Sequence, residues 1–199
     1  MVMVNLMVGI STLLIIAACT SAFSSSLPGN WRRAIVISAI LLSLVPVAGS
    51  SLWLWIGGAV GELSIVSLLV LISFIVRSLT SGSGNLIETR SRQQLYYLIL
   101  ITGLLLYPAS LGLSIYDPYT LGFGFELSLF LLVLSVICWF LKYRQLAVIL
   151  LIVIAAEAAG VLSSVNTWDY FIDPLLWLFS PVLLIILEIR QRRSVGMQY

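Results

Sequence analysis

One acidic side chain lies within one of the most apolar stretches of the chain. Glu157 is flanked only by small residues over positions 155–160, which read AAEAAG. A charged side chain at the centre of a membrane helix costs about 2.5–3.5 kcal/mol on insertion scales, and such residues usually face a bundle interior or a water-filled cavity. Glu157 is therefore the first candidate for a carboxylate that binds a proton or a cation. The alternative is a structural glutamate that joins neighbouring helices, which Ala156 and Gly160 would let approach closely.

Two further glutamates stand at the expected starts of apolar helices. Glu62 follows a glycine-rich turn, and Glu126 opens a long apolar run. A carboxylate in a first helical turn offsets the positive end of the helix, so we expect this role for both. Gly57 and Gly61 also permit a tight turn or a close helix contact. The alternative is that Glu62, Glu126 and Glu157 converge at one end of the bundle, where their oxygens would suit a hard cation or a basic partner.

Two aspartates precede prolines in patterns that favour structural roles. In Asp173-Pro174, the aspartate is expected to cap a helix and the proline to occupy its first position. The residues around Asp117-Pro118 are typical of a turn. We therefore predict that Asp117 and Asp173 hold the backbone rather than bind a ligand.

Side chains that common enzyme and metal sites require are missing or isolated. The chain contains no histidine, which removes the commonest general base and transition-metal ligand. Its two cysteines, Cys19 and Cys138, do not have the spacing of a zinc site. No phosphate-binding glycine loop precedes a lysine. We therefore predict no resident metal or other cofactor, and we expect no catalytic activity.

The composition indicates whether water or lipid surrounds the protein. Hydrophobic residues make up 61% of the 199 positions and charged residues only 9%, whereas soluble domains carry roughly 25% charged residues. Too few polar side chains are present to cover a surface that faces water. The net charge of +2 gives no reason to expect nucleic-acid binding. The chain is therefore predicted to be an all-α integral membrane protein.

Seven continuous apolar segments approach the length that a membrane requires. About 20 helical residues span a hydrocarbon core of about 30 Å. Pro46, Pro108 and Pro181 fall inside the second, fourth and seventh segments and predict kinks there. We predict one transmembrane domain over residues 1–199, with helices at 4–23, 34–56, 59–79, 95–115, 125–141, 145–162 and 171–189.

The basic residues predict how these helices are oriented. Arginine and lysine are retained on the cytoplasmic side of a membrane. With seven crossings, every connection that carries a basic residue falls on one side, and the remaining connections carry none. The predicted topology therefore has the amino terminus outside and the carboxyl terminus in the cytoplasm. The basic residues are Arg32, Arg33, Arg77, Arg90, Arg92, Lys142, Arg144, Arg190, Arg192 and Arg193.

These observations favour a noncatalytic membrane protein. Its small size, thin loops and missing motifs lead us to expect an accessory or scaffold subunit of a larger membrane assembly, with lipid and other membrane subunits as partners. One alternative is a small transporter or ion- or proton-conducting protein that uses Glu157 with the other carboxylates. A second is a membrane-embedded enzyme that acts on a lipid-linked substrate. The compact loops favour a bacterial cytoplasmic (inner) membrane.

Overall fold

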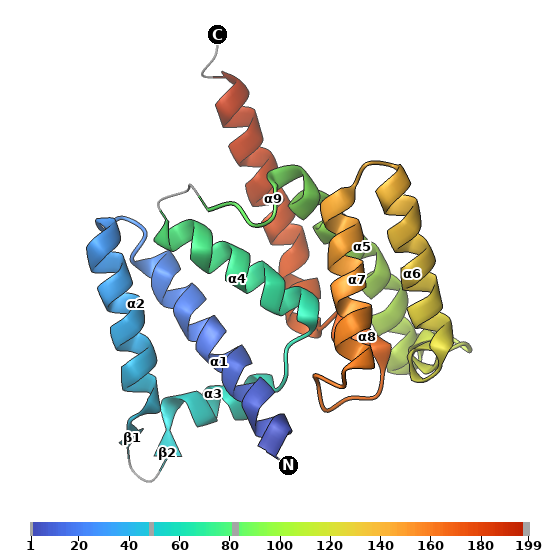
Figure 1. The fold of residues 1–199 in the computed structure, drawn as a ribbon, viewed down its shortest axis with the longest axis horizontal. Helices are drawn as coiled ribbons and strands as arrows, with labels where there is room; N and C mark the ends of the chain where they lie inside the picture. The colour runs from blue at the N-terminus through green and yellow to red at the C-terminus, as the bar shows by residue number, and fades with distance from the viewer. Residues whose placement is uncertain (1, 48–49, 81–83, 197–199) are drawn as a thin grey trace. The chain divides into compact units, whose positions relative to one another are not determined.

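Helices make up most of the described chain, as the apolar composition predicts. The computed structural model describes residues 2–47, 50–80 and 84–196, and Figure 1 labels its elements. In chain order these are α1 (Val2–Phe23), α2 (Gly29–Leu44), β1 (Pro46–Val47), β2 (Ser50–Ser51), α3 (Leu52–Val60), α4 (Ile65–Leu79), α5 (Thr89–Pro108), the π-helical turn η1 (Ala109–Leu113), the 3-10 helix η2 (Pro118–Phe123), α6 (Phe125–Phe140), α7 (Arg144–Ala158), α8 (Thr167–Phe171) and α9 (Pro174–Gly196).

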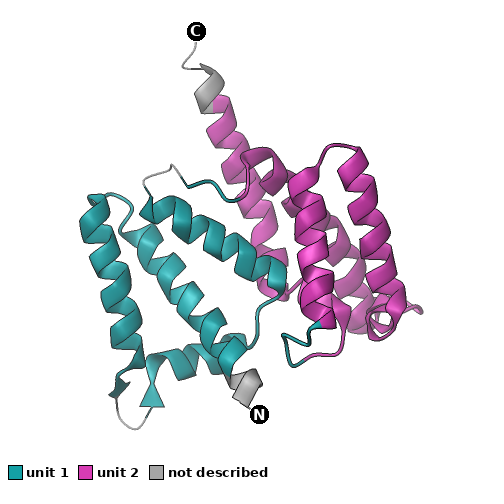
Figure 2. Cartoon of the chain, in the orientation of Figure 1, with its two compact units in different colours: residues 1–86, 159–163 teal, residues 87–158, 164–199 magenta. Residues whose placement is uncertain are grey.

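The chain divides into two compact units, which Figure 2 colours separately. Unit 1 comprises residues 1–86 and 159–163, and unit 2 comprises residues 87–158 and 164–199. Both contain fully buried apolar side chains, such as Val66 in unit 1 and Leu150 in unit 2. Each unit therefore has apolar packing of its own.

Three helical stretches are long and apolar enough to cross a membrane, and they indicate a membrane protein. They match the first, fourth and seventh predicted segments. The apolar helices α4 and α6 contain 15 and 16 residues, and at about 1.5 Å per residue they are shorter than the hydrocarbon core of about 30 Å. The seven-helix prediction is thus supported for three segments, which are Leu6–Phe23, Thr89–Leu113 and Thr167–Arg192.

The second and third predicted segments differ from the structure. Instead of continuing to residue 56, α2 ends at Leu44, because the chain then reverses and Pro46–Val47 pairs antiparallel with Ser50–Ser51. The pair Gly57-Gly58, predicted to turn between two long helices, lies inside α3. The turn instead follows at Gly61, whose φ of 72° is in the left-handed region that favours glycine.

The predicted prolines also have different positions relative to their helices. Pro46 begins β1 rather than kinking a helix. Pro108 is the last residue of α5, and the π-helical turn η1 with Gly112 at φ 83° follows it. Only Pro181 of the three lies well inside a helix, α9. The prediction that these prolines lie within helices is therefore confirmed for Pro108 and Pro181 and wrong for Pro46.

In unit 1, α1 packs against α2, α3 and α4. The Arg32 guanidinium joins the ends of α1 and α4, since its Nε donates to the Ser24 carbonyl at 3.2 Å and its Nη1 to the Ser78 carbonyl at 2.6 Å. Arg33 Nε similarly donates to the Leu79 carbonyl at 3.2 Å. Cationic side chains satisfy the last carbonyls of a helix and offset its negative end. The basic start of α2 thus caps two neighbouring helices.

Gly57 provides the close approach of α3 to α1. A Cβ atom at this position would lie 2.8 Å from Val8 Cγ1 and 3.0 Å from Thr12 Oγ1, whereas a Cβ atom at Gly58 would meet no atom within 4 Å. We expect Gly57→Ala to lower the free energy of unfolding by about 1–3 kcal/mol through overpacking. Gly58→Ala should raise it by about 0.5–1 kcal/mol through helix propensity.

Denaturant unfolding in detergent, followed by far-ultraviolet circular dichroism, measures both glycine variants. The two substitutions add the same methyl group to adjacent positions of α3, so each is the control for the other. Equal effects of the two alanines would contradict the packing of α3 on α1.

In unit 2, α6 packs against α7 and α5 packs against α9. A Schellman motif closes the turn between α6 and α7. Its two hydrogen bonds run from the Tyr143 N–H to the Cys138 carbonyl at 2.8 Å and from the Lys142 N–H to the Trp139 carbonyl at 3.1 Å. Lys142 takes the left-handed φ of 65° that this motif requires. The chain therefore reverses within a few residues, as predicted for this connection.

Helices α5 and α9 approach closely at Gly103. A Cβ atom there would lie 2.1 Å from Trp177 Cδ1, and the ring of Tyr107 packs on Trp177 with centroids 4.7 Å apart. Membrane helices commonly pack through small residues because dispersion contacts and close approach drive their association. Around Gly103, one glycine and two aromatic rings therefore form part of the α5–α9 contact.

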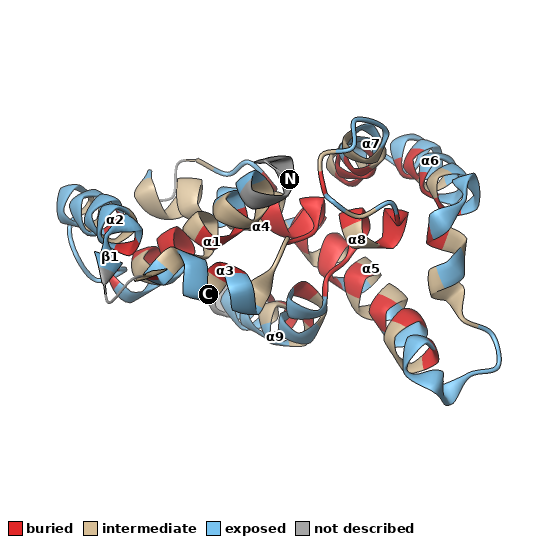
Figure 3. Ribbon diagram, turned by 90° about the horizontal axis from the view of Figure 1, so that it is seen from below, coloured by how far each residue is buried: buried red, intermediate tan, exposed pale blue. Residues whose placement is uncertain are grey.

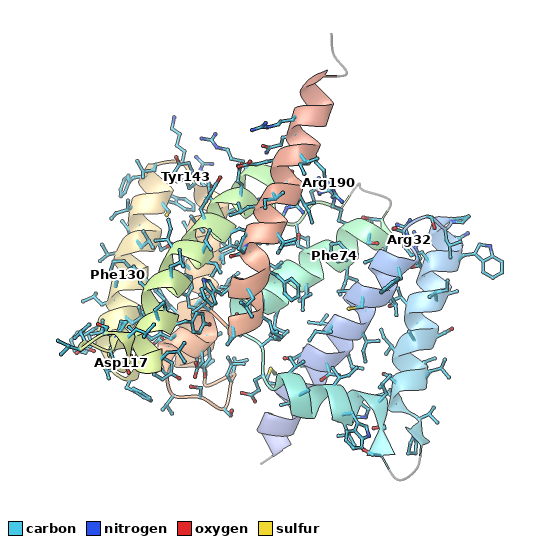
Figure 4. All side chains as sticks on the ribbon, turned by 180° about the vertical axis from the view of Figure 1, so that it is seen from behind. Arg32, Phe74, Asp117, Phe130, Tyr143 and Arg190 are labelled. Atoms are coloured by element: carbon cyan, nitrogen blue, oxygen red, sulfur yellow. The ribbon has the colours of Figure 1, made fainter. Side chains whose placement is uncertain are left out.

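The basic residues of unit 2 gather at one end of its helices. Arg90 at the start of α5 lies over the Tyr143 ring at 5.6 Å. Tyr97, further along α5, donates a hydrogen bond of 3.1 Å to Glu188 near the end of α9. These contacts place the start of α5, the α6–α7 turn and the basic end of α9 together, whereas Asp117 lies at the other end of this unit (Figure 4).

Large apolar side chains remain exposed along both helical pairs of unit 2. Figure 3 shows exposed positions along the outer side of α6. Such a continuous apolar surface is unfavourable in water and suits lipid or an apolar partner. On α6 the exposed side chains include Leu129, Phe130, Val133, Val136, Ile137 and Phe140, and on α9 they include Leu178, Phe179, Val182, Ile185, Ile186 and Ile189.

Candidate functional site

Glu157 lies in the last turn of α7, which ends at Ala158. The sequence predicted a helix to residue 162 and hence a deeper Glu157. Gly160, with φ 61°, takes the left-handed conformation that ends many helices. A Cβ atom at Gly160 would meet no atom within 4 Å. The prediction that Ala156 and Gly160 form a helix-packing pair is therefore wrong for Gly160, which stops the helix instead.

Both carboxylate oxygens of Glu157 accept hydrogen bonds from hydroxyl groups. Ser128 on α6 donates to Oε2 at 2.7 Å, and Thr167 at the start of α8 donates to Oε1 at 2.6 Å. Hydrogen bonds to an ionised oxygen are shorter and stronger than bonds between neutral groups. Glu157 thus connects α7 to α6 and α8, and it is half-buried there.

The two hydroxyls also contact each other and a backbone carbonyl. Ser128 Oγ and Thr167 Oγ1 are 3.1 Å apart, and Thr167 Oγ1 lies 3.2 Å from the Gly122 carbonyl in η2. Thr167 is completely buried. We call Glu157, Ser128, Thr167 and the Gly122 carbonyl the hydroxyl–carboxylate cluster. It brings oxygen atoms from four separate elements within hydrogen-bond distance of one another.

A second set of hydrogen bonds fixes η2 against α8. Asn166, fully buried, accepts from the Trp168 N–H at 2.9 Å and donates to the Tyr119 carbonyl at 3.0 Å. The Trp168 indole donates to the Pro118 carbonyl at 2.9 Å. A Cβ atom at Gly122 would lie only 1.8 Å from Asn166 Oδ1. The Gly122 carbonyl therefore reaches Thr167 because glycine leaves room for the Asn166 side chain.

Tyr119 and Asp169 form a separate pair beside this cluster. The tyrosine hydroxyl lies 3.1 Å and 3.0 Å from the two Asp169 oxygens, and Ser164 Oγ also donates to Asp169. Burial, followed by the charge of Asp169 and the hydrogen bond to it, raises the pKa of Tyr119 from 10.0 to about 12. The neutral phenol is thus the form that the folded protein favours.

A pH-dependent stability follows from Tyr119. Because its folded pKa of about 12 exceeds the ordinary value of 10.0, the unfolded chain loses this proton first as the pH rises. The contribution of Tyr119 to stability is therefore fully present below pH 10 and falls towards pH 12. We expect Tyr119→Phe to flatten this part of the profile. Denaturant unfolding at stepped alkaline pH measures it, and an unchanged slope in the variant would contradict the pairing with Asp169.

Glu62 does not have the helix-start role predicted for it. Helix α4 begins after Ser64, whose side chain accepts from the Ser67 N–H at 3.2 Å and caps the helix. Glu62 Oε2 instead accepts from the backbone N–H and the hydroxyl of Ser163, at 2.8 and 2.7 Å. Its Oε1 is buried without a hydrogen-bond partner among the described residues. Glu62 thus holds the segment 159–163 within unit 1.

Glu126 occupies the first turn of α6, as predicted. Its side chain is exposed, and α6 has no side-chain cap hydrogen bond. Glu126 and Glu157 belong to unit 2, and Glu62 belongs to unit 1. Across the described positions, no group of three acidic or cysteine side chains is placed to hold a metal ion.

The two aspartates beside prolines have the structural roles that the sequence predicts. Asp173 Oδ1 accepts from the Leu176 N–H at 2.8 Å, and α9 begins at Pro174. Asp117 Oδ1 accepts from the Tyr119 N–H at 3.0 Å and so caps η2. Short-range patterns were sufficient here because donor and acceptor lie within three residues of each other.

Sequence reasoning missed the partners of Glu157. Ser128 lies 29 positions from Glu157 in the chain and stands among apolar residues of α6. Thr167 and Gly122 fall in connections that we interpreted only as loops. The one available signal was the polar run Ser163–Thr167 directly after an apolar helix. It predicts capping, which Asn166 performs, but not the direction of the Thr167 hydroxyl.

No protein-family model, curated protein sequence or solved structure matches the chain. The chemistry that this chain can perform is therefore inferred from the geometry of the site. A carboxylate held by two hydroxyls can bind a proton, and the oxygen set can serve as a hydrogen-bonded joint between helices. Both possibilities place Glu157 at the centre.

Proposed function

We propose that the chain is a noncatalytic accessory or scaffold subunit of a larger membrane assembly. The carrying observation is that five acidic side chains within or beside apolar helices are engaged in hydrogen bonds that hold their own unit together. A carboxylate that caps a helix or joins two segments is not available to a substrate. These side chains are Glu62 with Ser163, Asp117 with Tyr119, Glu157 with Ser128 and Thr167, Asp169 with Tyr119, and Asp173 with Leu176.

The outward apolar faces of α6 and α9 support this function. A subunit that acts through contact needs an apolar surface that lipid covers until a partner replaces it. Phe130 on α6 is 58% exposed and Phe179 on α9 is 60% exposed. More than half of each side chain is left uncovered by the described chain. We propose that one or both faces contact another membrane subunit.

Site-directed photo-crosslinking in native membranes tests the subunit role. A photoreactive side chain at Phe130 or Phe179 should give a discrete adduct with one partner protein in stoichiometric yield. The matched control replaces Leu131, which is 1% exposed and next to Phe130, and should give none. Lipid adducts alone from both exposed positions would contradict an accessory subunit.

We further propose seven crossings, with the amino terminus outside and the carboxyl terminus in the cytoplasm of a bacterial inner membrane. The contacts of Arg32 in unit 1, and of Arg90 in unit 2, support it because they gather basic residues at one end of each unit. The positive-inside rule then assigns these ends to the cytoplasm. Short helices such as α4 and α6 would be accommodated by local thinning of the bilayer.

Cysteine accessibility tests this orientation. In a Cys19→Ser, Cys138→Ser background, single cysteines at the exposed positions Asn85, Thr120 and Val165 are exposed to a membrane-impermeant thiol reagent. Positions 120 and 165 should react in intact cells, and position 85 should react only after the membrane is opened. Labelling of position 85 from outside would contradict the topology.

A second candidate function is proton or cation conduction by a small transporter. The observation that favours it is the hydroxyl–carboxylate cluster around Glu157. The purified protein in liposomes should then show proton or alkali-cation flux that Glu157→Gln abolishes. Glu126→Gln removes an exposed carboxylate from α6 and should leave the flux unchanged. Absence of flux from a folded wild-type protein would remove this candidate and leave the subunit function in place.

A further inference from the structure

We propose that Glu157 reversibly binds one proton and that the Thr167 hydroxyl reverses its hydrogen bond when it does. In the ionised state Thr167 donates to Glu157, and in the protonated state it donates to the Gly122 carbonyl. The inference rests on the Glu157 site of the second candidate function, but it requires no movement of the proton across the membrane. The proton comes from water and forms an O–H bond at Oε1.

The number of protons in the ionised cluster motivates this assignment. Ser128 and Thr167 carry one hydroxyl proton each, so together they can donate two hydrogen bonds. Four oxygen contacts of hydrogen-bond length are present, at 2.7, 2.6, 3.1 and 3.2 Å. When both hydroxyls donate to the carboxylate, the contact from Thr167 to Gly122 has no proton. The ionised cluster therefore lacks the one proton that a hydrogen bond to the Gly122 carbonyl would need.

One added proton completes this series of hydrogen bonds without moving a heavy atom. With the proton on Glu157 Oε1, that oxygen donates to Thr167 Oγ1 across 2.6 Å. The Thr167 hydroxyl then rotates and donates to the Gly122 carbonyl across 3.2 Å. Ser128 continues to donate to Oε2 across 2.7 Å. Every proton has one acceptor in this state, which satisfies the requirement that buried polar groups be paired.

The hydrogen-bond partners of the Glu157 carboxylate are neutral groups. Among the described residues, the partners of its carboxylate are the two hydroxyls and no arginine or lysine. The oxygens already lie at hydrogen-bond spacing, so a proton fits between them as they stand.

Other titratable groups lie on the elements that pack against α7. They include Glu126 on α6, Asp169 on α8 and, on α5, Tyr107 at the end towards Asp169 and Asp173. Asp169 is hydrogen-bonded to Tyr119 and Ser164, and Glu126 is exposed. Each can contribute to an acid-induced signal, so the test must remove Glu157 specifically.

The reversal of Thr167 has a structural consequence. Only in the protonated state does a hydrogen bond link Thr167 at the start of α8 to the backbone of η2. Proton binding at Glu157 should therefore strengthen the η2–α8 contact. The Gly122 carbonyl reports this change because its stretching frequency falls when it accepts a hydrogen bond.

Infrared difference spectra between neutral and acidic pH test the proposal, with the full chain in lipid nanodiscs. A sample with ¹³C-carbonyl glycine identifies the glycine amide band. On acidification we expect a carboxylic-acid C=O band to appear and a glycine carbonyl band to shift to lower frequency. Glu157→Gln should lose the glycine shift and the part of the acid band that Glu157 contributes. Glu126→Gln, the matched control, should keep both.

Thr167 variants separate proton binding from the hydroxyl reversal. Thr167→Val should move the carboxylic-acid band to higher frequency and abolish the glycine shift, and Thr167→Ser should restore both. An undiminished acid band in Glu157→Gln would overturn the proposal, as would a glycine shift that persists in Thr167→Val. If Thr167→Val does not fold, a glycine shift that survives in Glu157→Gln overturns it.

The outcomes also distinguish this inference from conduction. Both infrared signals without proton flux in liposomes would remove the second candidate function and keep the proton site. Proton flux without either signal would remove the proposed proton site and keep the second candidate function.

Discussion

Gly122→Ala is expected to lower the free energy of unfolding by about 3 kcal/mol, at the upper end of typical overpacking effects. The added Cβ atom would lie 1.8 Å from Asn166 Oδ1 and 2.7 Å from Trp168 Cδ1. Asn166 cannot move aside easily, since it is fully buried, caps α8 and donates to the Tyr119 carbonyl. Relief of the clash must therefore break the junction between η2 and α8.

The matched control for this substitution is Gly124→Ala, two residues along the chain. A Cβ atom there would lie 2.0 Å from Glu126 Oε2, but this is the end of an exposed and flexible side chain that can rotate away. Its backbone, at φ −107°, suits any residue. We expect a change below about 0.5 kcal/mol, as for most surface substitutions. Denaturant unfolding in detergent measures both, and a mild effect of Gly122→Ala would contradict the packing of η2 on α8.

Thr167→Val should lower the free energy of unfolding by about 2–3 kcal/mol. Valine has nearly the same shape, so the loss comes from the hydroxyl rather than from a cavity. The substitution removes the 2.6 Å hydrogen bond to Glu157 and the 3.2 Å contact to the Gly122 carbonyl. A hydrogen bond to a charged group contributes about 1.5–3 kcal/mol, and an unpaired buried partner adds to the cost.

Thr167→Ser keeps the hydroxyl and is the control for this prediction. It should recover most of the lost stability, apart from the contribution of one methyl group. The same denaturant titration distinguishes the two variants. If valine and serine were equally destabilising, the hydrogen bond to Glu157 would not explain the loss of stability. Packing of the methyl group would explain it instead.

The parts of the fold that the sequence predicts correctly are those that local chemistry determines. Helix α1 closely follows the first apolar run, and α9 begins where Asp173 and Pro174 indicate. The start of α6 at Phe125 was also predicted to the residue. In each case, an uninterrupted apolar run or a cap within three residues sets the boundary.

The regions predicted wrongly are those where a turn lies inside apolar sequence. The chain reverses between α2 and α3, where Pro46–Val47 pairs antiparallel with Ser50–Ser51, although the hydropathy of this stretch predicts a continuous helix. Gly160 ends α7 four residues before the predicted boundary, which places Glu157 in the last turn. Hydropathy measures preference for lipid, and it does not report backbone dihedral angles. Glycine and proline positions carried that information but allowed more than one interpretation.

The candidate site was predictable only in its central residue. Glu157 is identifiable because a carboxylate in an apolar run requires explanation. Its partners Ser128 and Thr167 come from other helices, and their approach depends on tertiary packing. The sequence shows that position 122 is a glycine, but it does not show that this glycine leaves room for the Asn166 side chain. Pairings between distant segments cannot be derived from one sequence without contact information.

The hydroxyl–carboxylate cluster requires an energetic link between Glu157 and Thr167. A double-mutant cycle with Glu157→Leu and Thr167→Val, in wild-type and single-variant backgrounds, measures it through the free energy of unfolding. We expect the two substitutions to be non-additive, with a coupling energy of about 1–3 kcal/mol. Additive effects within about 0.5 kcal/mol would show that the two side chains do not interact, and would contradict the hydroxyl–carboxylate cluster.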